Sequence, residues 1–316
     1  MLRSSCANRD SCKPLRIALT GTTGRVGAAL AQALSAKHRV ISLPRNCCDL
    51  AERGSLAAAL KRLECDVFIN PAAITSLEAC EDDPLLAMRV NRDAPAEIAA
   101  WAADRGVMVF HFSTDYVFGG TAKYLYRETD MPEPISQYGR SKLAGENSVL
   151  AHPGNCVVRV SWVFGPEKPS FIDQILEAAL AGRPLSAVAD KFSLPLSTTD
   201  LADWMGRLVE LRPNGILHAC NSGDPVSWHG LATAAVEEAH ACGLLAGIPP
   251  IQEQQLGEMI SFRAARPVFT AMDTSRLAGL LGYVPRPWRE AIAEHIRQCR
   301  ALTKDYPRGN RKVIRN

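Results

Sequence analysis

The sequence lacks any apolar run of the about 20 residues that a membrane-spanning helix needs. It also lacks a marked charge of one sign, because 36 Lys and Arg residues offset 33 Asp and Glu residues and leave a formal net charge of +3. We therefore expect neither nucleic acid nor a membrane as a partner. The first residues have no apolar core of a secretory signal. We expect a cytoplasmic protein with a flexible extension at 1–14 and a basic flexible tail at 303–316.

Cysteine is present ten times, but the spacing of a metal site or a disulfide framework is missing. Cys65, Cys156 and Cys220 lie in apolar runs, and Cys47 and Cys48 are adjacent without a second pair. A chain of 316 residues can bury a core without covalent cross-links. We therefore expect reduced thiols, and we predict no metal ligands. Internal repeats and low-complexity segments are also missing.

A glycine-rich turn follows the first apolar run, 15–20, and an Ala- and Leu-rich helical stretch continues to residue 36. Strand, glycine turn and helix are the context of a dinucleotide-binding fingerprint, in which the N–H groups at the helix start bind phosphates. We predict that the cofactor contacts this turn through Gly21, Thr23, Gly24, Arg25, Val26 and Gly27.

The second predicted strand, 39–43, ends at Pro44 and Arg45. An NAD-specific site usually has an acidic residue here, which binds the ribose 2′-hydroxyl. Arg45, together with Arg25 of the glycine turn, can instead bind a 2′-phosphate. The sequence therefore favours NADPH, and NADH stays an alternative.

Further strands are predicted at 66–70, 107–112 and 156–160, with helical segments between them at 52–63 and 84–105. This alternation predicts an α/β fold with a Rossmann-type, doubly wound parallel sheet and a site at the carboxyl ends of the strands. After residue 165 the alternation is less regular. We expect a cofactor domain at 15–165, completed by a strand near 215–220, and a smaller α/β substrate lobe made mainly of 166–302.

Tyr138 and Lys142 lie four residues apart at the start of a predicted helix, so both side chains share one face. A phenol with a pKa of about 10 is a poor proton donor to a carbonyl at neutral pH. A nearby ammonium lowers that pKa by stabilising the phenolate. Thr114, just after the predicted strand 107–112, can hold the carbonyl oxygen by its hydroxyl.

Several motifs together resemble the extended short-chain dehydrogenase/reductase superfamily and, within it, the dTDP-4-dehydrorhamnose reductases. They are the glycine turn, S-T-D-Y-V-F-G at 113–119, Y-x-x-x-K, R-V-S-W-V-F-G at 159–165, and the closing R-P-V-F-T-A-M-D-T-S-R-L and P-W-R-E-A at 266–277 and 287–291. The resemblance implies an NADPH-dependent reductase of the C4 ketone of a nucleotide-linked 6-deoxy-4-ketohexose, and a homodimer. In it Tyr138 gives the proton, Lys142 tunes Tyr138 and holds the nicotinamide ribose, and Thr114 orients the carbonyl.

The resemblance also assigns roles to other residues. Asn91 would kink its helix and hold Lys142 through water. Contacts to the cofactor are implied for Asp49, Leu50, Ala72 and Ala73, and contacts to the sugar or its border for Thr75, Ser76, Asp115, Tyr116 and Trp162.

One segment departs from the family pattern. Residues 190–197 read D-K-F-S-L-P-L-S where these reductases usually have D-Q-x-G-x-P-T, so Lys191, Ser193 and Leu196 are unusual. The exact sugar and nucleotide therefore stay open, as does a divalent ion such as Mg²⁺. Two alternatives remain: an NAD-dependent sugar-nucleotide epimerase or dehydratase with Asp115 as an acid, and a non-catalytic NADP-binding regulatory subunit like that of methionine adenosyltransferase.

Overall fold

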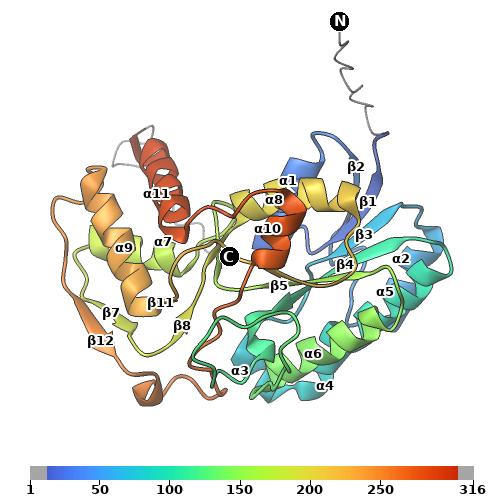
Figure 1. The fold of residues 1–316 in the computed structure, drawn as a ribbon, viewed down its shortest axis with the longest axis horizontal. Coiled ribbons are helices and arrows are strands. Elements are labelled where there is room, and N and C mark those ends of the chain that lie inside the picture. The colour runs from blue at the N-terminus through green and yellow to red at the C-terminus, as the bar shows by residue number, and fades with distance from the viewer. Residues whose placement is uncertain (1–12, 305–316) are drawn as a thin grey trace, which may run out of the picture.

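A six-stranded parallel sheet forms the centre of the computed structural model, which describes residues 13–304 (Figure 1). Most of the predicted extension and tail thus lies outside the described residues. The sheet order is β10-β5-β4-β3-β1-β2. The strands are β1 (Arg16–Thr20), β2 (Arg39–Leu43), β3 (Val67–Asn70), β4 (Met108–Thr114), β5 (Cys156–Val160) and β10 (Gly215–Ala219). The chain starts at β1 and adds β2 at one side of it. It then returns to the other side of β1 and adds β3, β4, β5 and β10 in turn. This doubly wound order confirms the predicted α/β Rossmann-type fold class.

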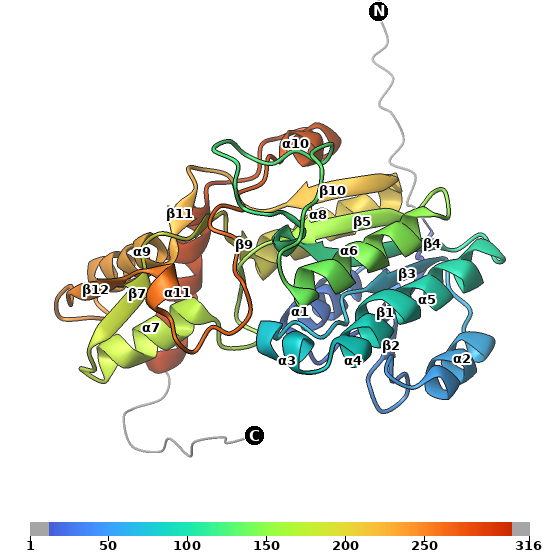
Figure 2. The ribbon, with the colours of Figure 1, turned by 90° about the horizontal axis from the view of Figure 1, so that it is seen from below.

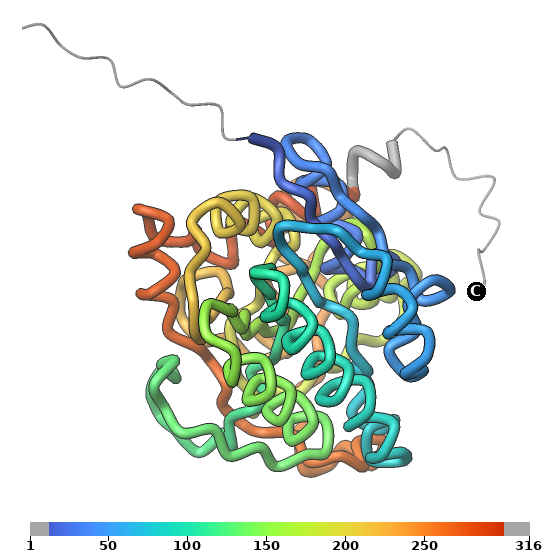
Figure 3. The backbone as a smooth tube through the Cα atoms, turned by 90° about the vertical axis from the view of Figure 1, so that its right-hand side faces the viewer, coloured from blue at the N-terminus to red at the C-terminus, as the bar shows by residue number. Residues whose placement is uncertain are grey.

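Helices cover both faces of the sheet (Figures 2 and 3). One face packs against α1 (Arg25–Leu34), α8 (Thr198–Leu211) and α10 (Ser275–Leu281). The other packs against α2 (Arg53–Arg62), α5 (Ala94–Ala103) and α6 (Gln137–Leu150). Because both faces are buried, the strands are apolar along nearly their whole length. On β4, Phe110 and Phe112 enter the first of these cores and Val109 the second.

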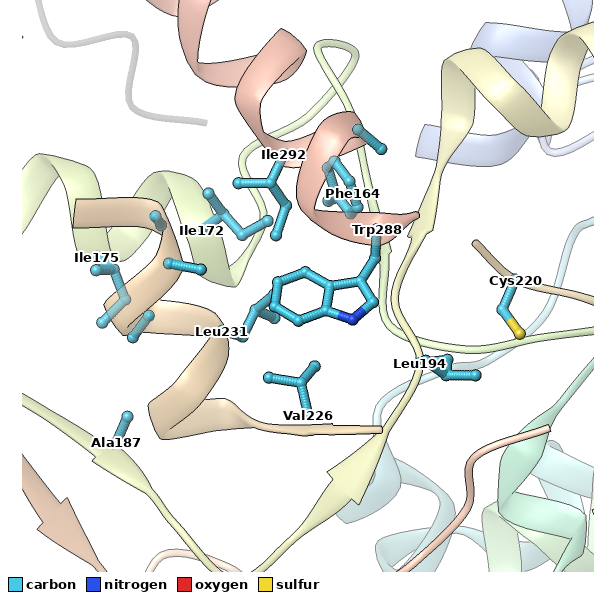
Figure 4. Close-up of a cluster of buried hydrophobic side chains, with 14 of the residues drawn as sticks. Phe164, Ile172, Ile175, Ala187, Leu194, Cys220, Val226, Leu231, Trp288 and Ile292 are labelled. Carbon is cyan, nitrogen blue, oxygen red and sulfur yellow. The ribbon is translucent and has the colours of Figure 1, made fainter. Parts of the chain in front are cut away.

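A smaller lobe lies beside the sheet, at the left of Figure 1. It contains the helices α7 (Phe171–Leu180), α9 (Trp228–Ala241) and α11 (Trp288–Lys304) and the parallel pair β7 (Leu185–Val188) and β12 (Ile251–Gln254). Its core surrounds the indole of Trp288, which packs near Val226, Leu231 and Ile292 (Figure 4). The indole N–H donates to the Asp224 carbonyl oxygen at 2.9 Å, so its polar atom is satisfied.

Short elements join the two parts, and the sequence did not predict them. Two-residue strands form the pairs β6 (Val163–Phe164) with β9 (Leu196–Ser197), and β8 (Phe192–Ser193) with β11 (Val226–Ser227). A 3₁₀ turn, η2 (Asp115–Val117), follows β4, and another, η3 (Leu256–Glu258), follows β12. Pairs this short carry no periodic pattern, because alternation needs about four residues to be seen.

The helix predicted over 84–105 is interrupted. It consists of α4 (Pro84–Met88), a π-helical turn, η1 (Arg89–Asp93), and α5, and it is preceded by the short helix α3 (Leu77–Asp82). Single π turns inside helices are frequent at functional sites. Among the described residues, no helix is both long and apolar enough to cross a membrane. The eight described cysteines are all free thiols.

Candidate active site

A cavity of about 710 Å³ opens at the carboxyl ends of β1, β3 and β4. Its wall contains 18 of the predicted site residues: Gly21, Thr23, Gly24, Arg25, Val26, Gly27, Arg45, Asp49, Leu50, Ala72, Ala73, Thr75, Thr114, Asp115, Tyr116, Tyr138, Lys142 and Trp162. Ser76 and Asn91 are not on this wall. The structure therefore brings together residues that lie up to 141 positions apart, from Gly21 to Trp162.

The glycine turn is shaped for an anion. A Cβ atom on Gly27 would lie 2.1 Å from the Gly21 carbonyl oxygen, so only glycine allows this close approach. Gly24 caps α1 without a side-chain hydrogen bond, and the first helical turn holds no acidic residue. The N–H groups at the start of α1 are thus left for a negatively charged ligand.

The two arginines predicted near the 2′-phosphate differ in their surroundings. The Arg25 guanidinium donates to the carbonyl oxygens of Val163 at 2.9 Å and Pro169 at 2.7 Å, and so ties the glycine turn to the chain after β5. The Arg45 side chain is 80% exposed, and its Nε donates to Asp49 at 3.1 Å. Arg45 is therefore the freer of the two cations.

Tyr138 lies in the first turn of α6, where the Ser136 hydroxyl caps the helix by accepting from the Gly139 N–H at 3.2 Å. Its ring packs edge-on against Tyr116, with 5.8 Å between the centroids. Burial raises the pKa of the Tyr138 phenol, and its contact with the Thr114 hydroxyl opposes this. The expected lowering of this pKa by Lys142 is not seen, and because burial raises the pKa the phenol is protonated at neutral pH.

Lys142 is buried one turn further along α6. Burial lowers the pKa of its ammonium to about 8, against an opposite effect of the Glu146 carboxylate. Its Nζ lies 3.4 Å from Nε2 of His111, a residue that the sequence analysis did not select. The signal for His111 was present, since it is a polar residue inside an otherwise apolar strand.

Asn91 and Ser76 have positioning contacts. Asn91 Oδ1 accepts from the Ile74 N–H at 2.9 Å, and Nδ2 donates to the Ile74 carbonyl oxygen and the Ser141 hydroxyl, each at 3.0 Å. The π turn thus holds the loop after β3 against α6. Ser76 caps α3 by accepting from the Ala79 N–H at 3.2 Å.

Asp115 is the centre of a buried hydroxyl network. Its Oδ1 accepts from the Thr114 hydroxyl at 3.1 Å. Its Oδ2 accepts from the hydroxyls of Ser161 at 2.9 Å, Ser193 at 3.2 Å and Thr270. Four hydroxyls from four separate segments therefore surround this one carboxylate, with those of Ser161 and Ser193 also 2.6 Å from each other, and Ser193 is one of the unusual residues of 190–197.

Lys191, the second unusual residue, is fully buried behind the cavity wall. Its Nζ lies 4.7 Å from the centre of the Tyr116 ring and donates to the Pro267 carbonyl oxygen at 2.6 Å. Burial lowers the pKa of Lys191 to about 8, while the Asp115 carboxylate favours the charged form. Two of the three departures from the family pattern, Lys191 and Ser193, thus contact the predicted sugar contacts Tyr116 and Asp115.

Trp162 has a strained backbone and an indole N–H without a hydrogen-bond partner among the described residues. Its φ of +43° lies in the left-handed region, which costs a non-glycine residue about 1 to 3 kcal/mol. Its buried indole N–H has no hydrogen-bond partner among the described residues. The same is true of the Ser113 hydroxyl, which also lies on the cavity wall. Unpaired buried donors of this kind are suited to binding a ligand.

A second cavity, of about 420 Å³, shares Trp162 and Val163 with the first. Its wall also contains the aromatic side chains of Phe171, Trp228 and Phe262. These three residues could not be predicted from the sequence, because they come from distant segments without a recognisable motif.

Comparisons with known proteins agree with this geometry. A family model described as the RmlD substrate binding domain matches residues 15–301. A dTDP-4-dehydrorhamnose reductase of Mycolicibacterium smegmatis is 34% identical over 300 residues, which cover 92% of this chain and 88% of that protein. The spore coat polysaccharide biosynthesis protein SpsK of Bacillus subtilis is 32% identical over 285 residues, or 90% and 97% of the two chains.

The fold is also similar to that of solved structures. A crystal structure of dTDP-4-dehydrorhamnose reductase from Bacillus anthracis in complex with NADP has a TM-score of 0.82 and 25% identity, and the match covers 90% of this chain and 99% of that one. Sequence and fold thus agree over almost all of the described residues. The chain therefore belongs to the dTDP-4-dehydrorhamnose reductase family, as its motifs predicted.

Proposed function

We propose that this protein is an NADPH-dependent reductase of the C4 ketone of a nucleotide-linked 6-deoxy-4-ketohexose, with dTDP-4-dehydrorhamnose as the substrate. The observation that carries the proposal is the meeting of Thr114, Tyr138 and Lys142 on one cavity wall that also contains the glycine turn. A carbonyl placed there would meet a hydroxyl, a protonated phenol and an ammonium together.

The residues present fit the cofactor. The pyrophosphate would lie on the N–H groups at the start of α1, close to Gly24 and Gly27, and Ala72 and Ala73 leave room for the rest of the molecule. Asp49 and Leu50 would border the adenine, and Arg45 the 2′-phosphate. When bound, NADPH supplies the hydride, and the protein contributes orientation and electrostatics.

Tyr138 would act as the proton donor. Its raised pKa keeps the phenol protonated, and the alkoxide that forms at C4 is far more basic than a phenolate, so proton transfer to it is favourable. Lys142, one turn away, would hold the nicotinamide ribose and stabilise the phenolate that remains. Thr114 donates to Asp115 in this structure, so it must turn from that carboxylate to hold the carbonyl oxygen.

The sugar would lie between Thr75, Tyr116 and Trp162, and the nucleotide would extend into the aromatic-walled second cavity. Asp115 would act through the hydroxyl network that orients Thr114. Because four hydroxyls surround its oxygens, it is poorly placed to serve as the acid of an epimerase or dehydratase.

The proposal is tested by mixing the purified chain with NADPH and dTDP-4-dehydro-L-rhamnose made in situ and following NADPH absorbance. Rapid oxidation that depends on Tyr138 is expected. Tight NADPH binding without turnover would reject this substrate, and it would favour a non-catalytic regulatory subunit.

Replacing Arg45 by Ala is expected to raise the KM for NADPH about tenfold or more, because a charged hydrogen bond to the 2′-phosphate would be lost. The KM for NADH, which has no such phosphate, should stay the same. Arg53→Ala is the matched control, since Arg53 is also exposed but is not on the cavity wall. Equal changes for both cofactors would contradict the assignment of Arg45.

We also propose that different parts of the chain bind the cofactor and the substrate. Residues 15–165 with β10 would bind the cofactor, residues 166–302 would mainly bind the sugar nucleotide, and two chains would form a homodimer. Sedimentation of the purified protein measures the last point, and a monomer at assay concentration would contradict it.

A further inference from the structure

Four buried polar side chains form a line from the end of β1 to α6, and the two end members, Thr20 and Lys142, are also on the cavity wall. Thr20 ends β1, Asn70 ends β3, His111 lies on β4 and Lys142 on α6, and none is more than 2% exposed. The Thr20 hydroxyl lies 2.6 Å from Asn70 Oδ1, and Asn70 Nδ2 lies 3.3 Å from His111 Nδ1. His111 Nε2 lies 3.4 Å from Lys142 Nζ. Asn70 and His111 are partners in the β3–β4 ladder, so the sheet itself fixes their spacing.

The packing of α6 brings Lys142 within reach of the imidazole. A Cβ atom on Gly145 would lie 2.1 Å from the Asn91 carbonyl oxygen and 3.3 Å from His111 Nε2, so a side chain here would force the helix away. His111 is buried between the sheet and α6. An apolar side chain in this position would need no hydrogen-bond partner. A buried imidazole does need one, and its partners here are Lys142 and Asn70.

His111 is the available acceptor for the ammonium. Glu146, the nearest acid along α6, is bound through both carboxylate oxygens to Arg159, at 2.9 and 2.6 Å. In the described part of the chain, no carboxylate oxygen lies within 4.0 Å of Lys142 Nζ. Besides Glu146, the Cys80 thiol of α3 acts on the pKa of Lys142, and Lys142 in turn acts on the pKa of His111 of β4. Burial and the neighbouring ammonium hold the pKa of His111 well below its usual value, so the ring is neutral.

The hydrogen-bond partners determine which ring nitrogen carries the proton. An ammonium can only donate, so Nε2 facing a charged Lys142 must be unprotonated and Nδ1 must carry the proton. Nδ1–H then needs an acceptor, which Asn70 supplies if its amide oxygen faces the ring and its NH₂ donates to the Thr20 hydroxyl. In the structure the amide nitrogen of Asn70 faces His111 Nδ1. This orientation suits the uncharged form of the Lys142 amine. The two amide orientations differ by a half turn, and the bonding partners decide between them.

We propose that His111 is a positioning residue for Lys142: its neutral ring accepts a hydrogen bond from the ammonium at Nε2, while Asn70 and Thr20 hold the proton on Nδ1. The network keeps Lys142 charged and directed toward the site, although the surroundings are apolar. This inference rests on the role of Lys142 in the proposed function. It adds three residues to that role, Thr20 of β1, Asn70 of β3 and His111 of β4.

The first test compares the pH dependence of kcat for His111→Leu and His111→Gln. Loss of the acceptor disfavours the charged amine, so its pKa falls below about 8 and the basic limb of the profile should move to lower pH by about one unit in the Leu variant. Turnover should then drop about tenfold on the alkaline side and much less near pH 6. The Gln variant keeps an acceptor oxygen and should retain the wild-type limb. A loss by the same factor at every pH would overturn the proposal in favour of a merely structural role.

The second test needs neither substrate nor turnover. ¹⁵N NMR of the full chain with labelled histidine, in which His111→Gln identifies the signals, should show a protonated Nδ1 and an unprotonated Nε2 at neutral pH. A proton on Nε2 would overturn the proposal even in an active enzyme. The expected tautomer in a chain that does not reduce the sugar nucleotide would instead support the network and reject the proposed function, so the two failures are distinguishable.

Discussion

Tyr138→Phe is expected to reduce turnover by about 100-fold to 10,000-fold, the range typical of losing a general acid. The reason is that the Tyr138 hydroxyl is a protonated donor at the cavity wall in contact with the Thr114 hydroxyl, while the ring itself would remain packed against Tyr116. Because only one oxygen atom is removed, the fold and NADPH binding should be kept. Stopped-flow absorbance measures the turnover, and NADPH fluorescence measures the binding.

Tyr116→Phe is the matched control for this prediction. Tyr116 contributes a second buried phenol on the same wall, 5.8 Å from Tyr138 between ring centroids. As a proposed sugar contact, it should alter KM more than kcat, within about tenfold. If the two variants lost the same turnover, or if Tyr138→Phe kept most of it, Tyr138 would not be the proton donor.

The parts of the fold that the sequence predicted well are those set by local patterns. The strands Arg39–Leu43 and Cys156–Val160 occur with the predicted bounds, because apolar runs between turn residues mark buried parallel strands directly. The glycine turn was predictable from three glycines, Gly21, Gly24 and Gly27, placed between an apolar run and a helical stretch. Tyr138 and Lys142 share one helix face because four residues are close to one helical turn.

The parts that could not be predicted depend on distant contacts. Asp115 meets Ser193 and Thr270, which lie 78 and 155 residues later in the chain. The π turn lies at Asn91, where the family resemblance implied a kink, but the apolar pattern of the segment alone is that of one long helix. The positive φ of Trp162 has no signal in its neighbours either.

The unusual segment 190–197 shows how contacts between distant residues can explain a departure from a sequence motif. On sequence grounds Lys191 and Ser193 were only departures from a family pattern. In the structure both act on the same carboxylate, Ser193 by a hydrogen bond and Lys191 by its charge, and Lys191 also lies over the Tyr116 ring. Lys191 and Ser193 thus contact two residues of the proposed sugar site, although neither lies on the cavity wall.

Glu146→Ala is expected to lower the free energy of unfolding by about 3 to 5 kcal/mol, the cost of leaving one charge of a buried ion pair alone. Glu146 and Arg159 are each 1% exposed, and two hydrogen bonds join the carboxylate to the guanidinium. The pair fastens α6, which carries Tyr138 and Lys142, to β5. Urea unfolding followed by tryptophan fluorescence measures the change.

Glu177→Ala tests whether burial is the cause. Its partner Arg183 lies at 3.4 Å, but both side chains are more than half exposed, so water replaces the lost contact. The midpoint of unfolding should therefore hardly move. Similar small shifts in both variants would show that the Arg159 charge finds water or another partner once Glu146 is removed. A large loss of stability confined to Glu146→Ala would mean that the buried ion pair holds α6, the helix with the proposed proton donor, in place. Removing one of the two charges would then cost more than water can offset.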